Sequence, residues 1–253
     1  MRRAVLVLTA LALGAPPARA EKLMLALSSQ QVTIASNYAG ADLTLFGAVR
    51  GARPGTRWDV IVQAEGPSGP VTVRRKEQVG PLWLNRATRA FARAPSFLTT
   101  LSSRPLQTVA SPEDVFSERL GLRAVAEGAP AEGTRKLSLS EDAAFIDALI
   151  RLQTERGHWI EDGGGVTFLD RDLFRATIHL PPDIAFGPYQ VDVRLYAGGM
   201  QAARETITFR VVKAGFEARV AALADKRRVA YGFVMALLAL AFGWTASAVF
   251  RRD

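Results

Sequence analysis

The feature that most constrains this chain is a run of residues without a charged side chain near its C-terminus, residues 229–250. As a helix this run is about 33 Å long at about 1.5 Å per residue, and the hydrocarbon core of a bilayer is about 30 Å thick. Residues 251–253 are Arg, Arg and Asp. The sequence therefore predicts a transmembrane helix at residues 229–250, preceded by a juxtamembrane helix at residues 215–228 and followed by a cytoplasmic tail at residues 251–253.

The N-terminus has the pattern of a secretory signal peptide. Arg2 and Arg3 precede an apolar stretch at residues 4–15, and Ala18-Arg19-Ala20 has the small-residue pattern of a cleavage site. The positive-inside rule places the C-terminal arginines in the cytoplasm. We therefore expect residues 1–20 to direct export, and residues 21–214 to form a periplasmic domain on a single-pass protein of the bacterial inner membrane.

Composition excludes several classes of protein. The chain has no cysteine, so the exported domain has no disulfide, thiolate metal site or covalently attached haem. The net charge is +8, but much of it lies at the two ends and in the cluster at residues 225–228. A basic face of the kind that binds nucleic acid is not indicated, and we expect no nucleic-acid partner and no cofactor.

Strands are predicted at both ends of the exported domain, because apolar and polar residues alternate there. The clearest pair, residues 189–197 and 206–211, is joined by Gly198-Gly199 and indicates an antiparallel hairpin. Gly187-Pro188-Tyr189 has the spacing of the tyrosine corner of immunoglobulin-type domains. Further strands are expected at residues 23–27, 31–35, 42–49, 58–65, 71–75 and 173–180.

Helical signals lie between these two groups of strands. Ser111-Pro112-Glu113-Asp114 is typical of a helix start, and a longer helix is expected from Ser140 to its cap at Gly157. The order of strands, helices and strands predicts a mostly β protein, an immunoglobulin-like antiparallel β-sandwich with a helical insertion at about residues 85–160. A separate helical domain is the alternative.

Two groups of residues are candidates for interaction. Arg74, Arg75 and Lys76 precede an aromatic turn and, with Arg104, could form a patch for a partner or an anion; the alternative is a solvated strand end followed by an apolar plug between the sheet and the insertion. In the predicted membrane helix, Ala239, Gly243 and Ser247 recur every fourth residue, which is typical of a packing face but also arises by chance.

Catalytic signals are weak. The two histidines, His158 and His179, do not have the spacing of a metal pair, and the glycine-rich segment at residues 161–165 lacks the spacing of a calcium loop. The sequence contains no Gly-x-Ser-x-Gly nucleophile motif. We expect no enzyme, no metal site and no catalytic residue.

Three segments, taken in order, carry a family resemblance: residues 42–48, residues 71–85 with Arg74-Arg75-Lys76, and residues 102–106 with Ser-Ser-Arg-Pro-Leu. In these segments the chain resembles a family of uncharacterised alphaproteobacterial transmembrane proteins. The resemblance implies a signal peptide, an exported domain and a C-terminal helix, in an inner-membrane protein sometimes placed beside permeases that resemble sulfite exporters. It assigns no catalytic residues.

These observations predict a membrane-anchored periplasmic accessory module that interacts with a membrane protein such as a transporter. A different class of function is a periplasmic protein that binds a small anion through Arg74, Arg75, Lys76 and Arg104. A third is a hydrolase without a recognisable motif.

Overall fold

The computed structural model describes residues 21–35, 37–51, 55–129, 138–214, 232 and 236–245, with the backbone alone at residues 79 and 86. The predicted signal peptide, juxtamembrane helix and cytoplasmic tail lie outside these residues. Of the predicted membrane helix, residues 232 and 236–245 are described and are helical. Within the described part of the chain, no helix combines the length and the apolar composition that a membrane crossing requires.

The domain at residues 21–214 consists mainly of strands, as the sequence predicts. The first seven are β1 (Lys22–Leu27), β2 (Gln31–Ile34), β3 (Ala41–Arg50), β4 (Trp58–Glu65), β5 (Ser68–Val79), β6 (Leu82–Pro95) and β7 (Leu98–Ser102). The helices α2 (Leu106–Val109), α3 (Pro112–Ser117), α4 (Gly121–Glu127) and α5 (Leu139–Glu155) follow. The chain then returns to strands β8 (Trp159–Asp162), β9 (Val166–Phe168), β10 (Leu173–Leu180), β11 (Gly187–Ala197) and β12 (Met200–Lys213).

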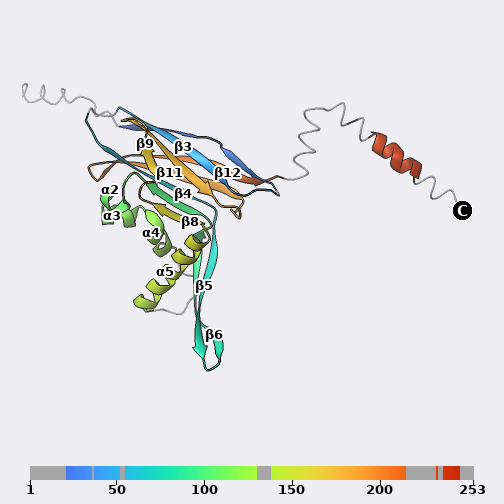
Figure 1. Cartoon of the computed structure of the whole chain (residues 1–253), viewed down its shortest axis with the longest axis horizontal. Helices are drawn as coiled ribbons and strands as arrows, with labels where there is room; N and C mark the ends of the chain where they lie inside the picture. Colours follow the sequence, from blue (N-terminus) through green and yellow to red (C-terminus); the bar gives the residue numbers. More distant parts are fainter. Residues whose placement is uncertain are drawn as a thin grey trace, which may run out of the picture.

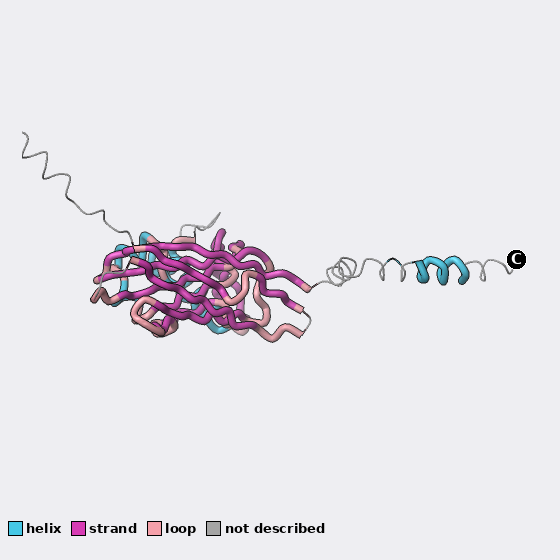
Figure 2. Tube along the Cα trace, turned by 90° about the horizontal axis from the view of Figure 1, so that it is seen from above, coloured by secondary structure: helices cyan, strands magenta, loops and turns pink. Residues whose placement is uncertain are grey.

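Two sheets pack face to face (Figures 1 and 2). One has the order β1-β3-β10-β9 and the other the order β2-β12-β11-β4-β7-β8. Their ladders are antiparallel except for the parallel pairs β2–β12 and β7–β8. The main core lies between the sheets and joins Leu45 and Phe174 of the first sheet to Val62 and Val193 of the second. The predicted antiparallel β architecture is therefore confirmed.

The helical segment is shorter than the sequence predicts. The described helices lie within residues 106–127 and 139–155, whereas residues 85–95 and 98–102, which we expected within the insertion, belong to strands β6 and β7. Alanines and arginines dominate the C-terminal half of β6, so its sequence lacks a clear apolar alternation, and pairing with β5 makes it a strand. The expected long helix is present as α5, but its N-cap is Ser138 and not Ser140, because the hydroxyl of Ser138 accepts a hydrogen bond from the N–H of Glu141 in a capping box.

A second apolar cluster joins the helices to the hairpin formed by β5 and β6. It contains Val73 and Phe91 from the hairpin, Phe145 and Leu149 from α5, and Trp159 from β8. The indole N–H of Trp159 donates a hydrogen bond of 3.0 Å to the carbonyl of Pro95 at the base of the hairpin. In Figure 1 the hairpin extends away from the two sheets beside α5.

Helices α2 to α4 cover the outer face of the larger sheet. Leu106, Val109 and Leu120 pack on Ile61 of β4 and Tyr196 of β11. Because the main core lies on the opposite face, the central strands β4 and β11 are buried on both sides, and most of their residues are buried. The helical segment therefore completes the burial of the sheet and is part of the same folded unit.

The tyrosine corner that the sequence suggests is present at the start of β11. The hydroxyl of Tyr189 donates a hydrogen bond of 2.7 Å to the carbonyl of Ala185, and its ring stacks on Phe209 at a centroid distance of 4.9 Å. Gly187 has a φ of +137°, which favours glycine at the bend. Burial raises the pKa of Tyr189 to about 12.

We predict that Tyr189→Phe lowers the free energy of unfolding by about 1 kcal/mol, because it leaves the carbonyl of Ala185 without its donor. The matched control is Tyr196→Phe on the same strand, since the buried hydroxyl of Tyr196 has no partner among the described residues. Its removal should leave stability unchanged or slightly higher. Urea denaturation of both variants measures the difference, and equal losses would contradict a stabilising tyrosine corner.

Candidate interaction site

The four cations of the predicted patch do not lie together. Arg74, Arg75 and Lys76 lie on β5, whereas Arg104 follows β7. The guanidinium of Arg104 pairs with both carboxylate oxygens of Asp59, and its Nε lies 2.7 Å from Oδ1. Asp59 is buried, and its pKa is lowered mainly by the hydrogen bond from Arg104. Arg104 thus neutralises a buried carboxylate of β4 and lies in a different part of the surface from the other three.

The surface around Arg104 is a wide cleft of about 700 Å³ that contains charges of both signs. Arg57 and Arg171 line it, but so do Asp170 and Asp172. This balance does not favour an anion, and the Asp59–Arg104 pair gives Arg104 a structural role. The sequence could not reveal this pairing, because the two residues are far apart along the chain.

The other three cations border a groove between β5 and α5. The groove has a volume of about 280 Å³, and Arg151 of α5 joins Arg74, Arg75 and Lys76 around it. Its apolar walls are Val73, Ala144, Phe145 and Ala148. We refer to these eight residues as the basic groove. Arg151 was not among the predicted site residues, because nothing in its own segment shows that α5 packs beside β5.

The basic groove carries an excess of positive charge. Arg75 pairs with Glu77 on the same strand at 2.7 Å, and Arg151 lies 3.8 Å from Glu155. These pairs are exposed, so they hold their partners weakly. For Arg74 and Lys76 the described residues provide no ion-pair partner. The groove therefore suits a negatively charged group attached to an apolar body.

The aromatic turn beyond the groove does not form the apolar plug that was the alternative interpretation. Leu82, Trp83 and Leu84 lie at the tip of the β5–β6 hairpin and are 61%, 66% and 47% exposed. Gly80 allows the tight turn through its φ of +61°. We refer to Leu82, Trp83 and Leu84 as the hairpin tip. The insertion packs instead on the base of the hairpin, through Val73 and Phe91.

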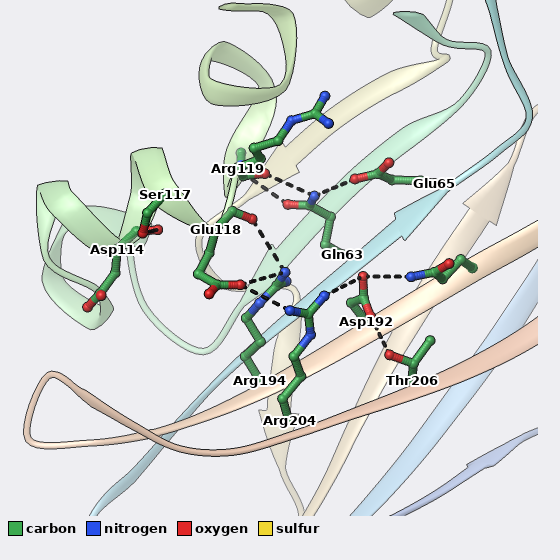
Figure 3. A network of polar contacts seen from close by, with 12 residues as sticks. Gln63, Glu65, Asp114, Ser117, Glu118, Arg119, Asp192, Arg194, Arg204 and Thr206 are labelled. Carbon is green, nitrogen blue, oxygen red and sulfur yellow. Dashed lines mark hydrogen bonds and ion pairs between the residues drawn. The ribbon is translucent and has the colours of Figure 1, made fainter. Parts of the chain in front are cut away.

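A buried polar network fastens the helical segment to the larger sheet (Figure 3). Arg194 of β11 is 2% exposed, and its Nη2 donates to the carbonyl of Glu118 at 3.4 Å and lies 3.6 Å from its carboxylate. Arg204 of β12 bridges Glu118 at 3.1 Å and Asp192 at 3.4 Å. Burial lowers the pKa of Arg194. The carboxylate of Glu118 thus places a negative charge beside the buried guanidinium of Arg194.

Gln63 of β4 fixes the turn between α3 and α4. Its amide N–H donates to the carbonyl of Arg119 at 3.1 Å, and its carbonyl accepts from the N–H of Gly121 at 3.2 Å. Arg119 and Gly121 both have positive φ values, +53° and +80°. Because α4 packs against α5, this turn also helps to set the position of α5 beside the hairpin.

The remaining predicted residues lie elsewhere. Ala239 and Gly243 are in the described helix, and a Cβ added at Gly243 would meet no atom within 4 Å; Ser247 lies outside the described residues. His158 Nε2 lies 2.9 Å from Asp183, and His179 Nδ1 lies 2.6 Å from Asp42. In the described part of the chain, no three potential metal ligands come together.

The fold and the groove define a mostly β protein with a helical segment and a cationic surface groove. The chain belongs to the family described as Putative transmembrane protein (Alph_Pro_TM), whose model matches residues 22–252. The family resemblance read from the sequence is confirmed. No curated protein matches the chain.

We predict that Glu118→Ala lowers the free energy of unfolding by about 2 kcal/mol, because it removes the carboxylate that faces the buried guanidinium of Arg194. Glu127→Ala is the matched control, since Glu127 pairs with the exposed Arg123 and should contribute no more than about 0.5 kcal/mol. Urea denaturation measures the free energy of unfolding of both variants, because urea is uncharged and does not screen the ion pairs as guanidinium chloride would. Similar values for both variants would mean that the network does not anchor the helical segment.

Proposed function

We propose that the protein is a membrane-anchored periplasmic accessory module that binds a membrane partner, such as a transporter, through the basic groove. The observation that carries this proposal is the convergence of four cations from two distant segments on an apolar wall. Arg74 and Lys76 are exposed and make no ion pair within the described chain. Cations that the fold does not use for its own stability are available to a ligand. Membership of a transmembrane family supports a membrane location.

We also propose that the domain is an immunoglobulin-like sandwich with a helical insertion between β7 and β8. Support comes from the order β1-β3-β10-β9, which matches the four-stranded sheet of that fold. The tyrosine corner of β11 is a second supporting feature. Such a sandwich presents loops and insertions on a rigid frame, which suits a binding module.

The membrane topology remains a proposal of the same kind. Residues 1–20 act as a signal peptide, residues 215–228 form a juxtamembrane helix, residues 229–250 cross the inner membrane, and residues 251–253 lie in the cytoplasm. The uncharged composition of residues 229–250 supports this. So does the described helix 236–245, whose Leu240, Phe242 and Trp244 are exposed apolar side chains. Ala239, Gly243 and Ser247 would then provide a face for a second helix.

A second candidate function is the binding of a small anion in the basic groove. The volume of about 280 Å³ favours it, because it is close to the lower limit for small-molecule sites. Binding to the folded state alone would raise the melting temperature with anion concentration. Phosphate-dependent stabilisation that Arg74→Glu removes would favour this function over a protein partner.

For the topology, we predict that a reporter active only in the periplasm works when it is inserted between Gly198 and Gly199. These glycines form an open turn in which an added Cβ would meet no atom within 4 Å. A reporter active only in the cytoplasm should work after Asp253. Activity measurements in intact cells test both fusions, and the opposite pattern would contradict the proposed orientation.

For the groove, we predict that the triple variant Arg74→Glu, Lys76→Glu and Arg151→Glu reduces recovery of a partner about tenfold or more, because it reverses the charge that attracts the partner. Recovery is measured by affinity isolation of the full chain from native membranes after cross-linking. The matched control reverses three other exposed cations, Arg50, Arg171 and Arg210.

The melting temperatures of both triple variants should stay within a few degrees of the parent, as is usual for surface changes. An undiminished recovery with the groove variant, or an equal reduction with the control, would contradict the groove as the binding surface.

A further inference from the structure

We infer that the hairpin tip inserts into the headgroup region of an anionic lipid bilayer, with the free cations of the basic groove facing the lipid phosphates. This inference rests on the proposed function, because it requires a domain held beside the membrane. It adds a second contact with the bilayer, separate from the C-terminal segment. It also names lipid as a ligand of this part of the molecule.

The first observation is the exposure of large apolar side chains where the fold does not need them. Leu82, Trp83 and Leu84 are consecutive and about half or more exposed. None of them belongs to the three apolar clusters of the domain or to the residues packed against these clusters. Tryptophan is enriched at membrane interfaces, where its ring lies at headgroup level.

The second observation is the arrangement of these side chains on the hairpin. Leu82, Trp83 and Leu84 pair with Val79, Gln78 and Glu77 of β5. Because successive residues of a strand point to opposite faces, Trp83 lies on one face of the hairpin and the two leucines on the other. A flat protein surface covers one face of such a hairpin, whereas a fluid bilayer surrounds both. The arrangement therefore favours lipid over a protein partner at the tip.

The third observation is the distribution of charge along the hairpin. No acidic residue occurs between Glu77 and the end of β6, and Glu77 itself pairs with Arg75. In the strand ladder Lys76 pairs with Asn85, one residue behind Leu84. It lies about 10 Å of strand from the turn after Val79, and Arg74 lies about 17 Å from that turn, at about 3.3 Å per residue. An interfacial segment reaches about 5–10 Å into the boundary between headgroups and acyl chains. Cations at this distance behind an apolar tip match the phosphates of an anionic surface.

The hairpin is also held so that its tip can reach a surface. Its base is fixed by Val73 and Phe91, which are 5% and 0% exposed in the second apolar cluster. From Val73 to Val79 the strand advances about 20 Å. Figure 1 shows the tip as the most distant part of the hairpin from the two sheets, beyond α5. The bilayer can therefore contact the tip without displacing the helices.

The test uses the full chain in lipid nanodiscs that contain no protein besides it and a cysteine-free scaffold. Since the chain lacks cysteine, Leu82→Cys provides a unique site for an environment-sensitive fluorophore. Met200→Cys is the matched control, because Met200 lies at the turn of another hairpin and is 75% exposed. In discs rich in phosphatidylglycerol, we expect a blue-shifted emission and quenching by spin-labelled lipids at residue 82 and neither effect at residue 200.

The charge dependence is tested on the same labelled protein. Arg74→Glu with Lys76→Glu should lower the ratio of inserted to free tip at least about fivefold per charge, as expected for basic residues at an anionic surface. Arg210→Glu, on another sheet, is the control. Pure phosphatidylcholine discs should show weaker insertion. Free inorganic phosphate should not restore the shift in those discs, and if it does, the groove binds a free anion and not a headgroup.

The inference would be overturned if, in anionic discs, the probe at residue 82 showed the same emission and the same lack of quenching as the probe at residue 200. A blue-shifted emission of the probe at residue 82 in native membranes but not in lipid discs would also overturn the inference. That result would assign the tip to a protein partner. Either result leaves partner recovery through the groove unaffected. Conversely, normal insertion with no recovered partner would contradict the proposed function and keep the lipid contact.

Discussion

The basic groove and the hairpin depend on one apolar cluster, in which Phe91, Phe145 and Trp159 are almost fully buried. A two-stranded hairpin is marginally stable in water when it stands alone. Strands β5 and β6 pair only with each other and with no strand of the two main sheets. Burial of its base against α5 and β8 therefore gives the hairpin a fixed direction. The same cluster sets the distance between Arg74 and Arg151, so the groove exists only while α5 remains packed on the strand.

The cations of the domain divide into two kinds by their surroundings. Arg104 and Arg194 face acidic residues, Asp59 and Glu118, and these contacts join the sheet to the segment that follows it. Removing one partner would leave a buried charge, which is costly. Arg74 and Lys76 have no such role and lie at the surface beside an apolar wall. This difference, and not the total charge of the chain, identifies the surface that is free to bind.

Local signals in the sequence predicted much of the fold. The alternation along β11 and β12, the Gly198–Gly199 turn, the tyrosine corner at Tyr189 and the start of α5 each depend on a few neighbouring residues. Contacts between distant residues were not predictable in the same way. Neither the Asp59–Arg104 pair nor Arg151 in the groove has a signal in its own segment. The pairing of β6 with β5 is also a contact between segments, and it alone shows that the aromatic turn lies at an exposed tip. The same pairing makes the start of the expected insertion a strand.

We propose that the hairpin and α5 form one binding surface at the membrane. Hydrogen exchange of backbone amides tests it most directly, with the full chain compared in native membrane vesicles and in detergent micelles. We expect slower exchange in the vesicles at residues 74–85 and 144–151, with the sandwich strands unchanged. Slower exchange confined to the outer face of β1, β3 and β10, or no change at the hairpin and α5, would contradict it.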